Sequence, residues 1–403
     1  MVPLTILRHT NMRITYAKKI DNIAKYPFSL VDEQLSKLKK QRIQVIDFGV
    51  GDPTTPTSAF IINHLATSAH NRAQSGYPNY TGELSYRTSC ASYLSREYGI
   101  NLDPETEISS TLGSKEAIFH FPAAFIDPGD LVICPTPAYP VYKTGTHFAG
   151  GNVYFTPLKE ENNFLIDLGS IPKSICAKAK IIWTNYPNSP TGVTAPKTWL
   201  HELVVWAREH NIIIAADEGC YNDLYTSNKP TSILQVAKEG ILAFYSLSKR
   251  SNMTGYRVGF VAGDKNIITG FRRLKSNIDS GTPTFIQDAA SRALDDVTEV
   301  SKMRSDYAEK RSILVSALNN RGLPTSTSNS TFYLWQKCAI GSTGHAFSNA
   351  LMKIGLITTP GEILSDITTG GLNPASQFVR FALVPQMKDI KEAARRIETD
   401  LVL

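Results

Sequence analysis

The sequence predicts an α/β fold, in which helices cover a mostly parallel sheet in a large domain and a smaller α+β domain completes the chain. Short apolar runs alternate with longer stretches whose apolar residues recur at helical spacing. That alternation is typical of βαβ units and of parallel sheets covered on both faces. From about residue 300 a long charged helix precedes isolated strands, which indicates a smaller domain. We expect the large domain over residues 57–299 and the small domain over 300–403.

The expected elements follow in chain order. Continuous apolar runs predict four buried strands, at 131–135, 179–185, 211–218 and 241–248. Apolar positions at helical spacing predict a helix over 198–210, between the second and third strands. The small domain is expected to hold a helix over 302–320, strands at 331–337 and 377–384, and a last helix over 387–401. Residues 1–56 are expected to form an N-terminal arm and part of the small domain.

Composition excludes several classes of protein. The 403 residues are 42% hydrophobic and 19% charged, which is typical of a folded globular protein rather than a disordered one. No apolar run approaches the ~20 residues of a membrane span, and the first residues lack a signal-peptide pattern. We therefore expect a cytoplasmic protein with no membrane partner. Translation could begin at Met1 or Met12.

Neither the net charge nor the spacing of cysteines and histidines indicates a nucleic-acid partner or a bound metal. The net charge is +6, and the densest basic run, residues 37–42, is interpreted as a solvated helix face. Nucleic-acid binding would need clustered lysine and arginine, so no nucleic-acid partner is expected. The five cysteines form no C-x-x-C pair and the eight histidines no H-E-x-x-H motif. Free thiols and no metal site are expected.

Polar side chains follow the carboxyl ends of the predicted strands. Parallel sheets bind their ligands beyond these ends. The polar side chains comprise an acid, two amides, two hydroxyls and an amine: Asp217, Asn185, Asn188, Ser246, Ser248 and Lys249. A lysine at the mouth of a dry crevice can act as an amine nucleophile. The hydroxyls and Arg257 suit a dianionic phosphate. A lone lysine is more often a surface residue, but the convergence of these groups favours a catalytic one.

The segment T-L-G-S-K-E-A-I predicts a second part of this site, because it opens a helix. Backbone N–H groups and the positive end of the helix dipole at Gly113, Ser114 and Lys115 would bind an anion. A plain helix cap by Ser114 is an equally good interpretation of that segment alone.

Seven ordered motifs together resemble class I/II pyridoxal-phosphate-dependent aminotransferases, whose fold is that of aspartate aminotransferase (fold type I). The pattern S-x-S-K-x7-R-x-G at residues 246–259 resembles the family's cofactor lysine motif, and the similarity runs from about residue 26 to the end of the chain. The resemblance implies pyridoxal 5′-phosphate as cofactor and Lys249 as the residue that binds it covalently. It also implies a homodimer with shared active sites.

The resemblance assigns further roles. Tyr139 would stack on the cofactor ring, Asp217 would pair with the pyridinium nitrogen, and Tyr77 would reach the phosphate in the partner subunit. Gly51 would lie beside the substrate carboxylate, which Arg380 would bind. Each residue also has a simpler interpretation: a packed loop aromatic for Tyr139, a helix cap for Asp217, and an edge-strand arginine facing water for Arg380.

Two positions depart from the family's pattern. An asparagine usually precedes P-T-G and bonds the cofactor's ring hydroxyl, but that position holds Ser189, and Asn188 lies one residue earlier. A tyrosine usually follows three residues after the aspartate, but that position holds Cys220, and Tyr221 comes next. Either member of each pair could serve, and we favour Asn188 and Tyr221.

The substrate is inferred from resemblance alone. Several segments are similar to LL-diaminopimelate aminotransferases and others to N-succinyl-diaminopimelate aminotransferases, which serve lysine and cell-wall precursor synthesis with 2-oxoglutarate as amino acceptor. Aspartate, alanine and aromatic aminotransferases share the same motifs and remain alternatives. A pyridoxal-phosphate β-lyase is a second class of enzyme on this scaffold. A regulatory protein would carry an added DNA-binding domain, for which the segment before residue 48 is short.

Overall fold

A seven-stranded sheet forms the centre of the large domain in this computed structural model, which describes residues 14–21, 44–323 and 330–402. The strand order is β2-β8-β7-β6-β5-β3-β4. Five neighbours, β7 to β4, run parallel, and β8 is antiparallel to both β7 and β2. The strands are β2 (Ile108–Thr111), β3 (Leu131–Thr136), β4 (Asn152–Pro157), β5 (Ala179–Thr184), β6 (Ile213–Gly219), β7 (Ile241–Ser246) and β8 (Gly259–Gly263).

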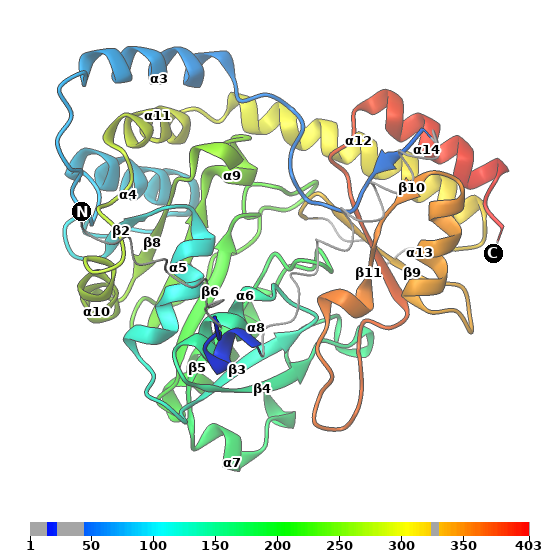
Figure 1. Ribbon diagram of the computed structural model, residues 1–403, viewed down its shortest axis with the longest axis horizontal. Coiled ribbons are helices and arrows are strands. Elements are labelled where there is room, and N and C mark those ends of the chain that lie inside the picture. The colour runs from blue at the N-terminus through cyan, green and yellow to red at the C-terminus, as the bar shows by residue number, and fades with distance from the viewer. Residues whose placement is uncertain (1–13, 22–43, 324–329, 403) are drawn as a thin grey trace, which may run out of the picture.

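Helices pack on both faces of this sheet (Figure 1). On one face lie α4 (Leu84–Tyr98), α8 (Lys197–Glu209) and α11 (Thr284–Asp295), with α3 (Ala59–Asn71) packed on α11 and the short α7 (Lys173–Cys176) at the sheet's end. On the other face lie α5 (Ser114–His120), α6 (Val141–Phe148) and α10 (Lys265–Lys275). Both faces bury apolar side chains because both are covered, so inner strands such as β7 are apolar rather than alternating, whereas β2 is mostly polar and the edge strand β4 is only partly buried.

The small domain is built on a second, three-stranded sheet. Its order is β11-β12-β9, all antiparallel, and a separate parallel pair joins β1 to β10. The strands are β1 (Ile46–Asp47), β9 (Tyr333–Lys337), β10 (Leu356–Ile357), β11 (Thr359–Pro360) and β12 (Phe378–Ala382). Its helices are α12 (Thr298–Asn320), α13 (Gly344–Lys353) and α14 (Met387–Thr399). Because β1 pairs with β10, the chain around residue 46 packs with the small domain.

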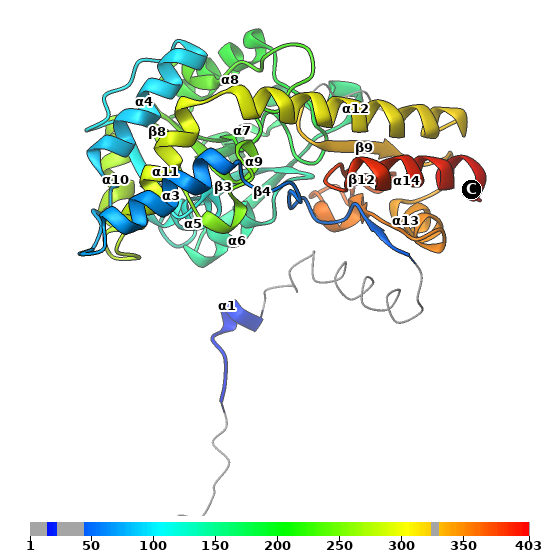
Figure 2. The same ribbon diagram turned by 90° about the horizontal axis from the view of Figure 1, so that it is seen from above.

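The helix α12 connects the two parts of the molecule. It begins beside the large domain and runs along α14 in the small domain (Figure 2). Its buried residues Leu314, Ala317 and Leu318 contact the apolar face of α14, so α12 contributes to the second core. A short helix, α1 (Lys18–Asp21), lies near α6, where the Lys19 ammonium is 5.2 Å from the centre of the Phe148 ring.

The expected fold is confirmed, with small differences at the ends of elements. The strand expected over 211–218 begins at Ile213, because Asn211 adopts a left-handed turn with φ of 55°. The strand expected over 241–248 ends at Ser246, where α9 (Leu247–Arg250) begins. Three strands of the large sheet, β2, β4 and β8, were not expected. The basic run at 37–42 and both candidate start residues lie outside the described part of the chain.

Candidate active site

Lys249 lies on the short helix α9, directly after the buried strand β7. Ser246 caps this helix, since its Oγ accepts a hydrogen bond from the N–H of Ser248 at 3.2 Å. The Lys249 Nζ donates a hydrogen bond to the carbonyl of Gly51 and lies 5.8 Å from the ring centre of Phe332. The amine therefore sits where the large domain meets the small one.

The residue after Lys249 anchors this helix to the large domain. The Arg250 guanidinium is 3% exposed and forms an ion pair with Asp223 at 2.8 Å. It also donates to the carbonyl of Ala293 at 2.7 Å. A buried guanidinium with this many partners has one orientation, so the turn that carries Lys249 is rigid.

Asp217 lies near the end of β6, on the face of the sheet that α5 and α6 cover. Its Oδ2 accepts a hydrogen bond from the Tyr142 hydroxyl at 2.7 Å. Its Oδ1 is buried and has no hydrogen-bond partner among the described residues. Burial raises the pKa of Asp217 to about 6, and hydrogen bonds with Tyr142 and Cys220 oppose that rise. A buried carboxylate of this kind requires a cationic donor, which the N–H of a protonated pyridine would supply.

The turn before α5 forms a cradle beside Arg257. Gly113 has φ of 73° and is the N-cap of α5, while Ser114 is its first residue and not its cap. A Cβ at Gly113 would lie 2.5 Å from Nη2 of Arg257, so only glycine fits there. Arg257 is exposed and donates to the carbonyls of Thr254 (2.7 Å) and Leu112 (3.4 Å). This arrangement suits a phosphate group, for which a guanidinium and backbone N–H groups are the usual donors.

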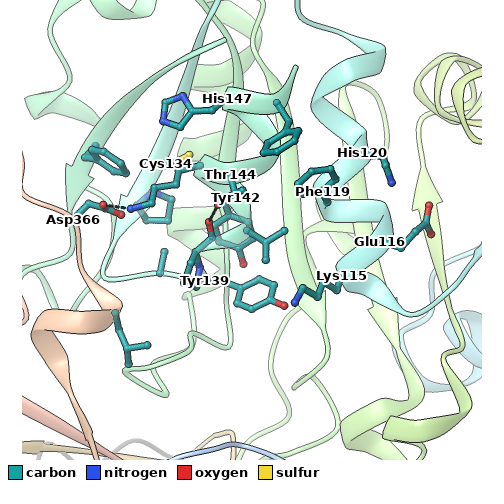
Figure 3. A pocket seen from close by; sticks show the side chains of 18 of the residues that line it. Lys115, Glu116, Phe119, His120, Cys134, Tyr139, Tyr142, Thr144, His147 and Asp366 are labelled. Atoms are coloured by element: carbon teal, nitrogen blue, oxygen red, sulfur yellow. Dashed lines mark hydrogen bonds and ion pairs between the residues drawn. The ribbon is translucent and has the colours of Figure 1, made fainter. Parts of the chain in front are cut away.

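A cavity of about 1050 Å³ opens from this turn. It is lined by α5, α6 and the small-domain residues 363–366. The ends of the Lys115 and Tyr139 side chains point toward each other in it (Figure 3). The Tyr139 ring stands at 80° to the Tyr142 ring, with centres 5.9 Å apart. An aromatic wall and a cation thus lie beside Asp217 and Gly113.

Arg380 lies on β12, which is the central strand of the small sheet, and its side chain is buried. The interpretation as an edge-strand arginine facing water is therefore wrong. Its Nη2 donates to the carbonyl of Gly49 at 2.9 Å, and its guanidinium lies 4.3 Å from the ring centre of Tyr333. A buried guanidinium over an aromatic ring can bind a carboxylate by two parallel hydrogen bonds.

The loop at residues 49–51 lies between the lysine and this arginine. The carbonyl of Gly51 accepts from Lys249, and that of Gly49 accepts from Arg380. A Cβ at Gly51 would lie 2.1 Å from the Tyr333 hydroxyl oxygen, so a larger residue does not fit. Two predicted residues, Lys249 and Arg380, thus both bond the loop that contains a third, Gly51.

The asparagine motif is organised inside its own loop. The Oδ1 of Asn188 accepts from the N–H and the hydroxyl of Thr191, at 3.0 and 2.7 Å. Asn188 is fully buried, and its Nδ2 has no hydrogen-bond partner among the described residues. Asn185 bonds the Asp217 carbonyl and the Ser189 N–H, and Ser189 itself is half-buried. The assignment of Asn188 to the cofactor's ring hydroxyl stays a prediction.

The second departure from the family's pattern separates two neighbouring residues. Cys220 lies with its Sγ 3.3 Å from the Ser114 Oγ and also packs against the edge of the second core. Tyr221 points into the second core, where its hydroxyl lies 3.2 Å from that of Tyr333. The structure therefore groups Tyr221 with Arg380 and Tyr333 rather than with Ser114, while its predicted bond to the cofactor stays untested.

Two further tyrosines, Tyr77 and Tyr142, bear on the site. Tyr77 lies between α3 and α4 and is 92% exposed, which leaves its side chain accessible to another molecule. Tyr142, the partner of Asp217, had no role in the sequence analysis. It could have been found there, because it ends the same P-x-P-x-Y-P-x-Y motif that contains Tyr139.

These features define a class of protein. The unpaired Oδ1 of Asp217, the cradle at Gly113 and the amine of Lys249 fit the pyridine nitrogen, phosphate and aldehyde carbon of pyridoxal 5′-phosphate. The fold and this site are those of a pyridoxal-phosphate enzyme.

The comparisons identify the family within that class. Residues 43–397 match the model of the family "Aminotransferase class I and II". The LL-diaminopimelate aminotransferase of Aquifex aeolicus is 42% identical over 95% of this chain and 98% of its own length. The enzyme of that name from Nitratidesulfovibrio vulgaris strain Miyazaki F is 38% identical over 94% and 98%. A mutant aspartate aminotransferase of Thermus thermophilus superposes with a TM-score of 0.88 at 25% identity, over 96% and 99% of the two chains. The chain belongs to the class I and II aminotransferases and is a pyridoxal-phosphate-dependent transaminase of amino acids and 2-oxo acids.

Neither a membrane-spanning helix nor a metal-binding cluster is present among the described residues. No helix in that part of the chain is long and apolar enough to cross a membrane. No group of three or more histidine, cysteine or acidic side chains there could hold a metal ion.

Proposed function

We propose that this aminotransferase takes the amino group from a diaminopimelate-type substrate and passes it to 2-oxoglutarate, in lysine and cell-wall precursor synthesis. The reaction type rests on one observation: Lys249 and Arg380 face the two sides of the loop at residues 49–51. The substrate rests on the 42% identity to an LL-diaminopimelate aminotransferase over 95% of the chain.

The residues that would hold the cofactor surround Asp217. The Gly113–Ser114 turn, Arg257 and the hydroxyls of Ser246 and Ser248 would bind the phosphate. Asp217 would accept a hydrogen bond from the pyridine nitrogen through its unpaired Oδ1. Tyr139 would stack on the ring. When bound, the cofactor withdraws electrons from the substrate's α-carbon, and Asp217 keeps the pyridine nitrogen protonated for this purpose.

Lys249 would carry the proton. Once the substrate's amino group had replaced it, its Nζ would be free to take the proton from the substrate's α-carbon and to deliver it to the carbon on the other side of the amino nitrogen. Its position on a capped, anchored turn limits the motion of the amine between those two atoms. Such positioning can contribute ~7–11 kcal/mol to lowering a barrier.

Arg380 would orient the substrate. The guanidinium holds the α-carboxylate and thereby fixes which bond of the α-carbon faces Lys249. In the described structure it donates to the carbonyl of Gly49, a neutral acceptor that a substrate carboxylate can outcompete. The α-carboxylate is common to the amino donor and to the 2-oxo acid acceptor, so one arginine would serve both halves of the reaction.

The division into residues 57–299 and 300–403, with residues 1–56 as an arm, would then place the substrate between the two domains. We also propose a homodimer, in which Tyr77 of one subunit binds the phosphate in the other. Its 92% exposure supports this role, because an exposed tyrosine is available to a second subunit. A cytoplasmic location stays a prediction.

The cofactor assignment is tested by trapping. Borohydride should bleach the yellow holoenzyme and attach the cofactor to Lys249, as read by peptide mass mapping. Lys275 is the informative control, because it is fully buried and paired with Asp279 at 2.6 Å. A label on Lys275 or Lys115 in place of Lys249 would refute the site.

The substrate is tested with a panel. The holoenzyme is mixed with 2-oxoglutarate and one of LL-diaminopimelate, N-succinyl-LL-diaminopimelate, aspartate, alanine or phenylalanine, and glutamate is measured. We expect a diaminopimelate compound to give the highest kcat/KM. Fast turnover of aspartate alone would move the assignment to aspartate aminotransferase. Release of ammonia and pyruvate from a β-substituted amino acid such as cystathionine, without a 2-oxo acid, would indicate a β-lyase.

A further inference from the structure

Lys275, the last residue of α10, is a fully buried lysine that the proposed mechanism does not use. Its Nζ donates to the Asp279 Oδ2 at 2.6 Å and lies 3.6 Å from the Glu116 Oε2. Its side chain is 0% exposed, and those of its two partners are 14% exposed. A buried ammonium carries a large desolvation cost unless carboxylates compensate its charge. Lys275 therefore ties α10 to Glu116, the third residue of α5.

Glu116 connects this ion pair to the turn that we propose binds the phosphate. Its Oε2 accepts a hydrogen bond at 3.2 Å from the N–H of Leu112, the residue directly before Gly113. The carbonyl of Leu112 accepts from Nη2 of Arg257 at 3.4 Å. Leu112 is thus held on one side by Glu116 and on the other by the guanidinium that lies against Gly113. The position of the turn relative to Arg257 therefore depends on Glu116.

Glu116 itself faces away from the cofactor side of α5. Figure 3 shows the side chains of Glu116 and His120 on one side of the helix and that of Lys115 on the other, where it points toward Tyr139. Glu116 thus acts on the turn from behind, through the backbone of Leu112, and has no direct path to a bound ligand.

The charge of Glu116 needs compensation at this place. A carboxylate two residues after Ser114 repels a dianionic phosphate bound at that turn, because charges interact over several ångströms inside a protein. Burial raises the pKa of Glu116, and the charge of Lys275 opposes that rise. The Oε1 of Glu116 has no hydrogen-bond partner among the described residues, so the carboxylate depends on the lysine. Lys275 therefore cancels a charge that the phosphate would otherwise meet.

We propose that Glu116 and Lys275 are positioning residues for the cofactor's phosphate: Glu116 holds the N–H of Leu112 and with it the turn at Gly113, and Lys275 neutralises Glu116. The inference rests on the proposed function, in which this turn and Arg257 bind the phosphate. It adds two residues that do not touch the cofactor.

The test compares two ligands that differ at the phosphate. Full-length apoenzyme is titrated with pyridoxal phosphate and with pyridoxal, which carries a hydroxyl in place of the phosphate. Both dissociation constants are read from the absorbance of the bond to Lys249. Their ratio measures what the phosphate contributes to binding. A variant that only loosens the fold weakens both ligands and leaves this ratio unchanged.

Lys275→Met tests the compensation of charge. We expect its affinity for pyridoxal phosphate to fall at least about tenfold and its affinity for pyridoxal to change less than about twofold. Adding Glu116→Gln should restore the ratio, because the charge is gone and the amide oxygen still accepts from Leu112. Lys310→Met is the matched control, since Lys310 is 4% exposed and pairs with Asp306 at 2.7 Å, but lies on α12. It should keep the wild-type ratio.

Glu116→Gln and Glu116→Met test the hydrogen bond and leave the buried lysine paired with Asp279. Both variants remove the charge, and only the glutamine keeps an acceptor for the N–H of Leu112. Glu116→Gln should keep or raise the ratio. Glu116→Met should lower the ratio at least about fivefold.

The outcomes separate the inference from the function on which it rests. An unchanged ratio in Lys275→Met would overturn the inference, and so would equal ratios in Glu116→Gln and Glu116→Met. If Lys275→Met does not fold, the two Glu116 variants decide. If wild type binds pyridoxal as tightly as pyridoxal phosphate, or traps neither on Lys249, the proposed function itself fails.

Discussion

Asp217 shows how a site can be organised at the expense of stability. Its carboxylate is buried beside one hydroxyl, and burial raises its pKa to about 6 from 3.8. Because the folded pKa is the higher one, the folded apoenzyme binds the proton more tightly than the unfolded chain does. Stability therefore falls as pH rises from about 4 to 6, and the full loss, on the order of 2–3 kcal/mol, persists above pH 6.

This linkage predicts the effect of Asp217→Asn on the apoenzyme. The amide cannot ionise, so the variant should be more stable than wild type at pH 8, by on the order of 1–3 kcal/mol. The difference should shrink toward pH 4, where the wild-type carboxyl is protonated. Urea unfolding of both apoenzymes across this pH range measures it.

The same unfolding experiment on the holoenzymes tests whether Asp217 contributes to cofactor binding. Pyridoxal phosphate should stabilise wild type and stabilise Asp217→Asn much less, because an amide does not hold the pyridine nitrogen protonated. An Asn variant that is less stable than wild type at pH 8 without cofactor would show that Asp217 is satisfied by the protein alone.

Arg380 gives a second prediction. A lysine cannot form two parallel hydrogen bonds to a carboxylate, so Arg380→Lys should lower kcat/KM on the order of 100-fold or more. The loss should be similar for every amino acid and should appear in both half-reactions, because all these substrates share the α-carboxylate. Steady-state and single-turnover kinetics measure it.

Arg395→Lys is the matched control, because Arg395 is exposed on α14 and contacts its surface neighbours Glu392, Thr399 and Asp400. It should leave kcat/KM unchanged. A loss in Arg380→Lys confined to dicarboxylic substrates would mean that Arg380 binds a side-chain carboxylate, and the substrate would lie reversed in the cleft.

Some residues of the site could be predicted from the sequence and others could not. Lys249, Gly51 and Arg380 could be proposed because each lies in a motif, and the structure brings Lys249 and Arg380 to the loop at residues 49–51. The direction of Cys220 and Tyr221 could not be predicted, because it depends on the bulge at Glu218. A shift of one residue reverses which side chain faces which side, and no pattern in the sequence marks that shift.

At the scale of elements, the apolar runs predicted four of the five parallel strands, β3, β5, β6 and β7, to within a few residues, and missed the partly exposed edge strand β4. Each of the four predicted strands is buried on both faces, so its sequence is continuously apolar and easily recognised. The strand β8 was missed because Gly259–Gly263 holds two glycines and follows directly on the lysine motif, whose chemistry dominated the interpretation. Residues far apart in the chain place it between β2 and β7.

The loop at residues 49–51 is the element on which both halves of the site depend, and it gives a third prediction. In Gly51→Ala the added Cβ would meet the Tyr333 hydroxyl, so the loop must move away from Lys249 and Arg380. Displacement of about 1 Å can cost on the order of 100-fold in rate. We expect kcat/KM to fall at least tenfold while cofactor trapping on Lys249 persists.

Gly76→Ala is the control for this change, since nothing lies within 4 Å of a Cβ at Gly76. It should be neutral. Tyr333→Phe removes the closest contact and should recover part of the activity of Gly51→Ala in the double variant. Full activity of Gly51→Ala alone would show that the loop tolerates the shift and does not position the site.

At the scale of the molecule, side-chain contacts join the two domains in addition to the chain that connects them. Lys143 on α6 pairs with Asp366, and the Thr136 hydroxyl accepts from the Asp366 N–H at 2.7 Å. These contacts lie at the rim of the cavity, opposite Lys115 and Tyr139 (Figure 3). Side chains from both domains therefore meet at the rim of this cavity.

The last prediction concerns assembly. If Tyr77 completes the site of a second subunit, Tyr77→Ala should lose tenfold or more in activity, because it removes a hydrogen bond to a charged phosphate. Lys249→Ala should be inactive. In a mixed dimer of the two variants, one site carries both defects and the other carries neither. Random reassembly at equal amounts makes half of the dimers mixed, so activity should rise to about a quarter of wild type.

The control is the same mixture of the two variants without subunit exchange. Unexchanged homodimers should show only the mean of the two parents, and activity should grow as dimers are dissociated by dilution or mild urea and allowed to reform. Size-exclusion chromatography with differently tagged subunits measures the mixed fraction in parallel. Exchange without a gain in activity would show that Tyr77 serves its own subunit, and the 92% exposure of its side chain would then need another partner.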